Sequence, residues 1–345
     1  KNIMFDKQYL FDTIYTLFSI DSPSGYTKNA TEFIKQEVEK FGYTANYTNK
    51  GNLIVDIKGK DEILHALGAH VDTLGLIVRS ISECGTLNFE RIGGPLLPTL
   101  DGEYCKIITR DGKEYTGTIL SKSPATHVFE DAKTRVRDEH NMEIRIDEIV
   151  RSKKDVMDLG IQNGDYIFID PKTIITEKAF IKSRFLDDKV CCCAILCVLK
   201  YLSENQLTPM HSFKIIFSTY EEVGHGSSYI PKEIKEFLSV DMGCVGLDLA
   251  CTEYDVSICA KDSSGPYDYN FVTKLSNYAK ESNLNYAIDI YPKYSSDVSA
   301  ALRAGSDIRG CVIGPGVHAS HGMERCHYLG LENTMKLLVE YMLKG

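Results

Sequence analysis

A change of pattern in the middle of the chain limits the folds that the sequence can adopt. From about Gly85 to Lys182, short segments with alternating apolar residues are separated by turn residues. On either side of this stretch, apolar residues at helical spacing alternate with short β-like runs. Helices alternating with strands are typical of an α/β domain, whereas closely spaced short strands indicate a small barrel or sandwich. We therefore expect a mixed-sheet α/β domain interrupted by an inserted, barrel-like β domain.

The 345 residues suffice for two such domains. We expect the α/β domain to comprise residues 1–82 and 183–345, and the inserted β domain to comprise residues 83–182. In the α/β domain, the spacing of apolar residues predicts helices over 9–20, 27–41, 188–202, 230–238, 267–282 and 331–343. Short β-rich runs predict strands over 52–57, 63–71, 74–81, 213–219, 244–249 and 285–290.

Composition excludes several classes of partner. The formal net charge is −9, and no run of basic residues is longer than Lys153-Lys154, which argues against nucleic acid or an anionic membrane surface as a partner. No apolar stretch is long enough to span a bilayer, and the start of the chain has no apolar signal core. We expect a cytoplasmic protein.

The chain holds 11 cysteines, an odd number that cannot pair completely. Cys191, Cys192, Cys193 and Cys197 lie together in an apolar helical pattern. Adjacent side chains on a helix point about 100° apart, so three consecutive thiolates cannot converge on one metal ion. These cysteines are interpreted as reduced, small core residues.

An adjacent pair of carboxylates, Glu221-Glu222, follows the apolar β-rich run 213–219. Successive side chains on an extended segment point to opposite sides. One carboxylate can therefore face a metal ion while the other faces substrate or water. A solvated turn would explain the pair by itself, so its interpretation depends on the other acids and histidines of the chain.

Three further positions carry acids or histidines at the ends of predicted elements. His70 and Asp72 are two residues apart at a strand end and share one face, so Asp72 could orient His70. Asp187 and Asp188 open the cysteine-rich helix, where we expect Asp188 to cap the helix and Asp187 to reach an ion. Asp248 follows an apolar run in the predicted strand 244–249.

The C-terminal region adds His318, His321 and His327, of which we expect one to be a ligand. With His70, Asp187, Glu222 and Asp248, a late histidine completes a set of nitrogen and oxygen donors suited to two divalent ions that share one carboxylate. Sites in open α/β sheets lie beyond the carboxyl ends of strands, where most of these residues are expected.

The order of these residues resembles the tetrahedral aminopeptidase family, also called glutamyl-aminopeptidase-like, a group of exopeptidases with two catalytic metal ions. The resemblance extends from about Asp6 to Leu343 and departs from the family pattern at Thr73, where a glutamate is usual, and at Gly322-Met323, where Ser-Pro is common. It includes Asp21-Ser22-Pro23-Ser24-Gly25, Ile92-Gly93-Gly94, Met157-Asp158-Leu159-Gly160-Ile161, Gly164-Asp165, Lys182-Ser183-Arg184 and Ser296-Asp297.

The resemblance implies a role for each residue of the set. Asp187 would bridge two divalent ions, with His70 and Asp248 on one ion and Glu222 and His321 on the other. The nitrogen and oxygen donors themselves suit zinc or cobalt and leave manganese open. His321 is favoured over His318 because Glu324 follows at the family's interval. Glu221 would be the general base and Asp72 would orient His70. In such relatives the peptide bond between the paired aspartates is often cis.

The resemblance therefore implies an aminopeptidase that acts on short peptides as a homo-oligomer, a cage of the dodecamer type. Three alternatives remain open. A deacylase or carboxypeptidase could use the same metal centre, and an inactive assembly subunit would lack a ligand, although none is missing here. A cellulase activity has been attributed to relatives, but a glycosidase needs a carboxylate pair without metals.

Overall fold

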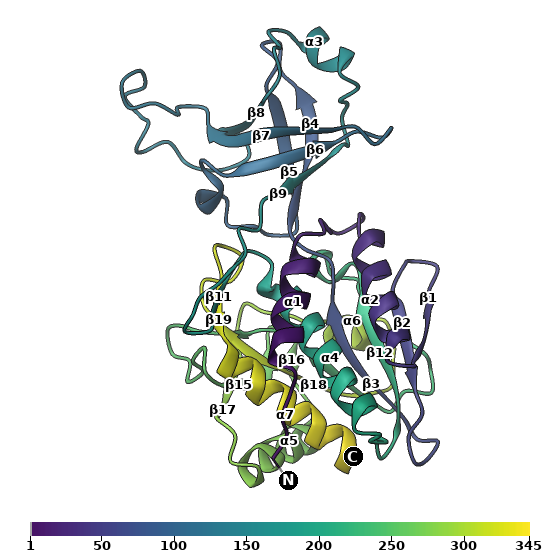
Figure 1. Cartoon of the computed structure of the whole chain (residues 1–345). Helices are drawn as coiled ribbons and strands as arrows, with labels where there is room; N and C mark the ends of the chain where they lie inside the picture. The colour runs from purple at the N-terminus through teal and green to yellow at the C-terminus, as the bar shows by residue number, and fades with distance from the viewer. Residues whose placement is uncertain (1) are drawn as a thin grey trace. The chain divides into compact units, whose positions relative to one another are not determined.

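The structure is a computed structural model that describes residues 2–345, and it divides into two compact units. The larger, called the α/β unit, contains the residues up to Thr73 together with Thr173–Ser320 and Glu324–Gly345. The smaller, called the barrel unit, contains Leu74–Lys172 and His321–Met323. Figure 1 shows both units, with the mixed α/β architecture and the β insertion that the sequence predicts.

A ten-stranded mixed sheet forms the centre of the α/β unit. Its main path has the order β1-β2-β12-β3-β13-β18-β15-β16, while β14 pairs with β18 and β17 pairs with β15. The neighbours β12, β3, β13 and β18 run parallel to one another. The strands are β1 (Thr44–Tyr47), β2 (Leu53–Ile57), β3 (Leu64–His70), β12 (Ser212–Ser218), β13 (Glu236–Val240), β14 (Gly243–Cys244), β15 (Val256–Asp262), β16 (Gly265–Pro266), β17 (Tyr286–Tyr291) and β18 (Arg309–Val317).

Helices cover both faces of this sheet. One face packs against α1 (Lys7–Phe18), α2 (Lys28–Lys40), α4 (Leu186–Glu204), α5 (Tyr269–Glu281) and α7 (Tyr328–Lys344), which share the larger apolar core. The other face packs against the short α6 (Asp297–Arg303) and a smaller core. A separate three-stranded sheet joins β10 (Ile174–Ile175), β11 (Phe180–Lys182) and β19 (Arg325–His327).

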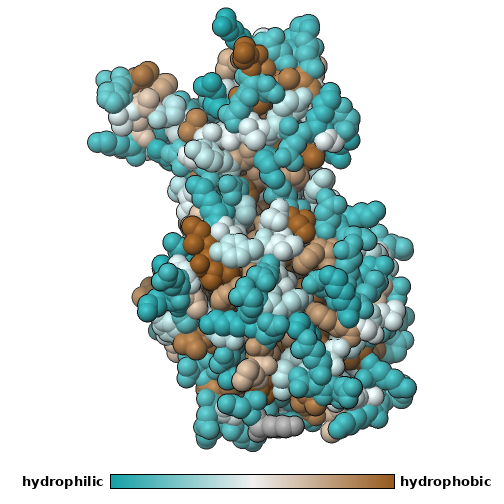
Figure 2. All heavy atoms as spheres, in the orientation of Figure 1, coloured by the Kyte–Doolittle hydropathy of each residue, from teal (hydrophilic) through white to brown (hydrophobic). Residues whose placement is uncertain are grey.

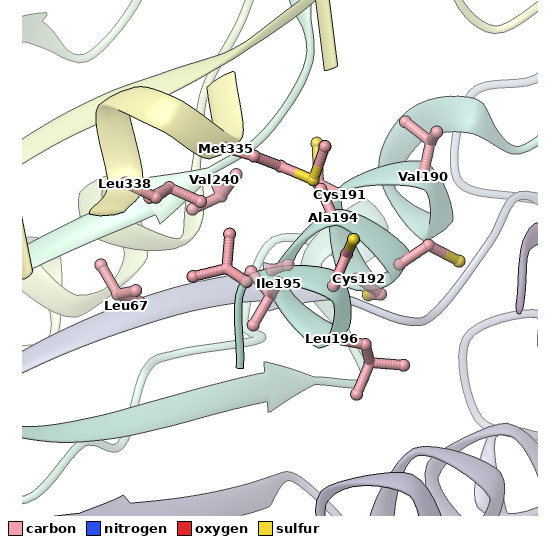
Figure 3. Close-up of a cluster of buried hydrophobic side chains, with 14 of the residues drawn as sticks. Leu67, Val190, Cys191, Cys192, Ala194, Ile195, Leu196, Val240, Met335 and Leu338 are labelled. Carbon is pink, nitrogen blue, oxygen red and sulfur yellow. The ribbon is translucent and has the colours of Figure 1, made fainter. Parts of the chain in front are cut away.

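The cysteine-rich helix α4 lies at the centre of the larger core. Cys191, Cys192, Cys193 and Cys197 are buried in this core. Figure 3 shows Cys191 and Cys192 among aliphatic side chains. All 11 cysteines are free thiols, and burial raises the pKa of Cys197 to about 12. This agrees with the prediction that the consecutive cysteines pack the core.

The barrel unit is a closed six-stranded barrel with the strand order β4-β5-β8-β7-β6-β9. Its strands are β4 (Gly75–Ile81), β5 (Leu87–Ile92), β6 (Tyr104–Ile108), β7 (Glu114–Ser121), β8 (Met142–Ile146) and β9 (Tyr166–Ile169), accompanied by η1 (Leu97–Leu100) and α3 (Lys153–Asp158). The unit begins at Leu74 rather than at residue 83, because β4 pairs with β5 and β9 instead of joining the large sheet. It ends at Lys172 rather than at residue 182, because β10 and β11 pair with β19.

Two predicted elements next to the large sheet are wrong. The residues predicted as a helix over 230–238 instead lead into strand β13, which is buried at every position. The strand predicted over 244–249 is limited to the two residues of β14, after which the chain turns and Leu247 is 98% exposed. Strand β15 was not predicted from the sequence.

Within residues 2–345, no helix is both long enough and apolar enough to cross a bilayer. The faces in view are largely hydrophilic, with apolar side chains in small groups (Figure 2).

Candidate active site

Three parallel strands end at the same edge of the large sheet. Strand β3 ends at His70, and Ser218 at the end of β12 is its register partner. Strand β13, on the other side of β3, ends at Val240 and is followed by Asp241. Because parallel strands place their carboxyl ends together, the residues that follow them meet in space.

The meeting point is a cluster of one imidazole and several carboxylates. The Nε2 atom of His70 lies 3.0 Å from Asp187 Oδ1, 3.2 Å from Glu221 Oε2, 3.7 Å from Asp241 Oδ2 and 3.9 Å from Glu222 Oε1. Three groups have donor atoms within 4.8 Å of one another: His70 with Asp187 and Glu222, His70 with Glu221 and Asp241, and Asp187 with Asp188 and Asp241. We call these six residues the carboxylate cluster.

The cluster concentrates negative charge where water is largely excluded. Burial, followed by repulsion from neighbouring carboxylates, raises the pKa of Glu222 and Asp241 well above the ordinary values. The pKa of Glu221 is raised in the same way, although His70 acts in the opposite direction. Buried carboxylates this close require either protons or cations. A donor set of one imidazole nitrogen and several carboxylate oxygens fits divalent metal ions.

His70 is held in the orientation that a metal ligand needs. Its Nδ1 atom lies 2.8 Å from the main-chain oxygen of Asp72, so the neutral imidazole carries its proton on Nδ1 and presents Nε2 to a metal ion in the cluster. Its main-chain N–H donates to Oδ2 of Asp188 over 3.1 Å. Asp188 is buried, so the expectation that it merely caps the helix is wrong: its carboxylate supports His70 and belongs to the carboxylate cluster.

Asp72 positions the adjacent glutamates. Its Oδ1 accepts a hydrogen bond from the main-chain N–H of Glu221 at 3.1 Å, and its Oδ2 accepts one from that of Glu222 at 3.2 Å. The hydroxyl of Ser24 donates to the same Oδ2 at 2.5 Å. The main chain of the turn around Ser24 also forms hydrogen bonds with the main chain of Thr73. The Asp21–Gly25 motif therefore braces the strand end that carries His70 and Asp72.

Asp187 is held from the C-terminal part of the chain. Its main-chain N–H donates to Oε1 of the buried Glu324 at 3.1 Å, while the main-chain oxygen of Glu324 accepts from the N–H of Ser183. The peptide bond between Asp187 and Asp188 is cis, as the resemblance implies. In the sequence, Glu324 stands out only by its spacing from His321.

A buried polar network supports the loop that carries Glu221 and Glu222. Asn52 accepts from the N–H of Thr219 at 3.1 Å and donates to the main-chain oxygen of Gly226 at 2.8 Å. Asp297 accepts from the hydroxyl of Ser218 and from the N–H of Ser227. At Gly226 a Cβ atom would lie 2.4 Å from Asp297 Oδ1, so no larger residue fits there without movement.

The prediction that Asp248 is a ligand is wrong. Asp248 lies in an exposed turn at positive φ, outside the carboxylate cluster, whereas Asp241 belongs to the cluster and is 3% exposed on its side chain. The physical reason is the strand end: β13 stops at Val240, so the acid that follows the strand is Asp241. The same rule would have identified Asp241 had β13 been assigned.

The late histidines have different surroundings. His321 belongs to the barrel unit, where its Nδ1 lies 2.9 Å from the main-chain oxygen of Gly94. His318 is exposed, and its main chain pairs with Arg325. The side chain of His327 accepts from the N–H of Leu329 at the start of α7 and contacts the main-chain oxygen of Lys178. His321 therefore remains a predicted ligand, on the strength of the sequence pattern.

Comparison with known proteins decides the family. The profile of the M42 glutamyl aminopeptidase family matches residues 51–337. The chain belongs to the M42 family. M42 peptidases are metal-dependent hydrolases, and the chemistry of the carboxylate cluster fits that property.

The M42 assignment agrees with individual relatives. The chain is 42% identical over 333 residues to YhfE of Bacillus subtilis (strain 168), which is named as an aminopeptidase, and the match covers 96% of each chain. Two solved structures share the fold over both units. They are a TET aminopeptidase from Thaumarchaeota archaeon SCGC AB-539-E09 (TM-score 0.87, 18% identity, 96% of each chain) and the TET1 peptidase of Pyrococcus horikoshii (TM-score 0.84, 21% identity, 97% of this chain and 100% of that chain).

Proposed function

We propose that this M42 aminopeptidase removes N-terminal residues from short peptides by means of two divalent metal ions held in the carboxylate cluster. The observation that carries the proposal is the convergence of His70 with four carboxylates from three different strand and helix ends, at distances of 3.0 to 3.9 Å from Nε2. Stability alone gives no reason to bury so many acids together.

The proposed ligands are His70, Asp187, Glu222, Asp241 and His321. Asp187 lies in one donor group with Glu222 and in another with Asp241, and these two ligands are assigned to different ions, which supports Asp187 as the carboxylate shared between them. Asp241 takes the place first given to Asp248, and His321 keeps the place that the sequence pattern implies. Zinc or cobalt suits a set of nitrogen and oxygen donors.

When bound, the ions would lower the pKa of water and polarise the scissile carbonyl. We assign Glu221 as the general base that takes a proton from the attacking water and delivers it to the leaving amine. Three features support this role. The carboxylate of Glu221 lies beside Nε2 of His70, its main chain is fixed by Asp72, and burial raises its pKa toward the range in which a carboxylate can both accept and release a proton.

The assembly belongs to the same proposal. The Pyrococcus horikoshii TET1 peptidase can assemble into a tetrahedron or a large octahedral shell. By analogy we propose that this chain forms a cytoplasmic homo-oligomer, a cage of the dodecamer type, which short peptides enter and folded proteins do not.

The activity is tested with a panel of aminoacyl chromogenic substrates, each with a free or an acetylated amine, assayed with the metal-loaded protein with and without chelator. Chelator-sensitive cleavage of only the free-amine compounds supports an aminopeptidase. Cleavage of only the acetylated compounds would instead establish a deacylase, and cleavage of neither would support an inactive subunit.

Two neighbouring substitutions test the assigned roles. Glu221→Gln should lower kcat by a factor of about 10² to 10⁴, the usual contribution of a general base, while metal content stays near that of the wild type. Glu222→Gln should lower both the metal content and the activity. Loss of metal in Glu221→Gln would move Glu221 into the ligand set and contradict its assignment as the base.

A further inference from the structure

Tyr294 lies between β17 and α6, in a loop that no part of the proposed mechanism uses. The main-chain oxygen of Tyr294 accepts hydrogen bonds from the N–H and the hydroxyl of Ser263 at 2.9 and 2.7 Å. Its ring packs against that of Tyr291 with 5.2 Å between centroids. Tyr294 is therefore anchored through its main chain and its ring, which together fix the position of the hydroxyl.

The hydroxyl of Tyr294 is buried and has no hydrogen-bond partner among residues 2–345. Neighbouring buried tyrosines differ in this respect: Tyr291 is bonded to the hydroxyl of Ser257, and Tyr267 is bonded to Asp262 and Ser296. Buried phenols nearly always find a partner, because an unpaired polar group loses its hydration without compensation. The unpaired hydroxyl therefore points to a partner that arrives from outside the chain.

The surroundings of Tyr294 indicate where that partner binds. After burial, the largest influences that raise the pKa of Tyr294 well above its ordinary value are the charges of Asp241 and Asp187. Both residues are proposed metal ligands, and their donor atoms lie within 4.8 Å of each other. The loop of Tyr294 leads into α6 at Asp297, which bonds to Ser218 and Ser227 on either side of Glu221 and Glu222. The phenol thus lies within the electrostatic reach of the site and keeps its proton, so that it can act as a donor.

We propose that Tyr294 is a further catalytic residue, whose hydroxyl donates a hydrogen bond to the oxygen of the scissile carbonyl as negative charge develops on it. The inference rests on the proposed peptide hydrolysis. In the covalent step, the oxygen of water bonds to the carbonyl carbon and the carbon–nitrogen bond breaks. The proton from water travels through Glu221 to the leaving amine, while Tyr294 retains its own proton throughout. A donor already placed in a water-poor site stabilises the transition state more than the ground state.

The test is Tyr294→Phe in the full-length, metal-loaded protein, which removes only the hydroxyl. Loss of one oxyanion donor should lower kcat by a factor of about 10² to 10³ with little change in KM. An aminophosphonate dipeptide, whose tetrahedral phosphorus resembles the intermediate, should bind more weakly by a similar factor. Metal content should not change, and the thermal midpoint of the metal-free protein should not fall, since the hydroxyl has no partner to lose.

Tyr291→Phe is the matched control. It removes a neighbouring buried hydroxyl that is bonded to Ser257, so it should lower the thermal midpoint but leave kcat within about threefold of the wild type.

Three results would overturn the assignment of Tyr294: a kcat within about threefold of the wild type, a rise in KM alone, or a loss of activity that accompanies loss of metal. A chelator-sensitive wild type combined with an unaffected Tyr294→Phe variant would reject this inference and leave the proposed function intact. A metal-loaded wild type that cleaves no free-amine substrate would reject both.

Discussion

Oδ1 of Asp72 accepts a hydrogen bond from the main-chain N–H of Glu221 at 3.1 Å, and this contact joins the end of β3 to the loop after β12. Because the other carboxylate oxygen binds the N–H of Glu222, one side chain fixes the direction of both glutamates. We infer that Asp72 is a positioning residue, which acts on the chemistry through the residues that it holds.

Asp72→Asn should lower kcat/KM by a factor of about 10 to 100, the usual cost of losing a group that orients ligands and catalytic residues. An asparagine keeps one acceptor but turns an amide NH₂ group toward the remaining donors. The measurement is steady-state kinetics of the metal-loaded variant, together with its metal content and thermal midpoint.

Asp289→Asn provides the control for Asp72→Asn. Asp289 also binds two consecutive main-chain N–H groups, those of Ala250 and Cys251, both at 2.9 Å, but it lies outside the carboxylate cluster. A similar loss of activity in both variants would show that Asp72 acts only through stability.

Asn52→Ala should reduce kcat more than it affects KM. Asn52 holds both sides of the loop that carries the glutamates, through Thr219 and Gly226. Its removal should lower the unfolding free energy by about 1 to 3 kcal/mol, because buried donors and acceptors are left unpaired. Kinetics and chemical denaturation of the same preparation measure the two effects.

Asn333→Ala is the control that distinguishes a loss of stability from a loss of loop positioning in Asn52→Ala. Asn333 is a comparable bridge in the same unit, since it accepts from the N–H of Asn285 and donates to the oxygens of Tyr254 and Leu329. The Asn333→Ala variant should lose a similar amount of unfolding free energy, while its kcat stays near the wild-type value. Equal losses of kcat in the two variants would contradict a positioning role for Asn52.

The metal-free protein should become less stable as pH rises above about 6.5, where the unfolded chain has released protons that the native cluster still holds. The pKa of Glu221 and of Glu222 is raised well above 4.5, and the pKa of Asp241 is raised well above 3.8. Burial by itself would lower the pKa of His70, but the charges of Glu221 and Asp241 raise it well above 6.5. In this range the native state therefore binds more protons than the unfolded chain, and each extra proton lowers stability by about 1.4 kcal/mol per pH unit.

Metal should reverse this trend. Ligands must lose their protons to bind a cation, so the rise in thermal midpoint on adding zinc should be larger at high pH. Asp241→Asn should flatten the pH dependence of the metal-free protein, because it removes one of the buried carboxyl groups that hold extra protons. Rising stability of the metal-free wild type over this pH range would show that the cluster is not proton-loaded without metal.

The sequence was sufficient for the architecture and for most of the site. The α/β class, the barrel-like insertion and the buried role of Cys191–Cys193 follow from periodicity and spacing, and the structure agrees with each of them. His70, Asp187, Glu221 and Glu222 were identified from their combination and order, since each of them alone has an ordinary explanation, and these four do meet in space.

The error at Asp248 has one physical origin. Ile230, Ile234 and Phe237 follow one another at helical spacing, which predicted a helix through residue 238. Strand β13 lies inside the sheet, flanked by β3 and β18, and is buried on both faces, so it lacks the alternation that marks a strand exposed on one side. Without that strand, the acid at its end could not be recognised.

Tyr294 and Asn52 could not have been found by pattern. Each lies far from the cluster residues in sequence and acts through a single atom or a pair of main-chain contacts, which only the packed structure reveals. The domain boundaries were missed by about ten residues because a strand's own sequence does not say which sheet it joins.

The most direct measurement is the metal content and aminopeptidase activity of two variants prepared in parallel, Asp241→Asn and Asp248→Asn. The buried Asp241 belongs to the carboxylate cluster and Asp248 lies in an exposed turn, so Asp241→Asn should lose bound metal and turnover while Asp248→Asn should match the wild type in both. Retention of full metal content and activity by Asp241→Asn would contradict the proposed centre.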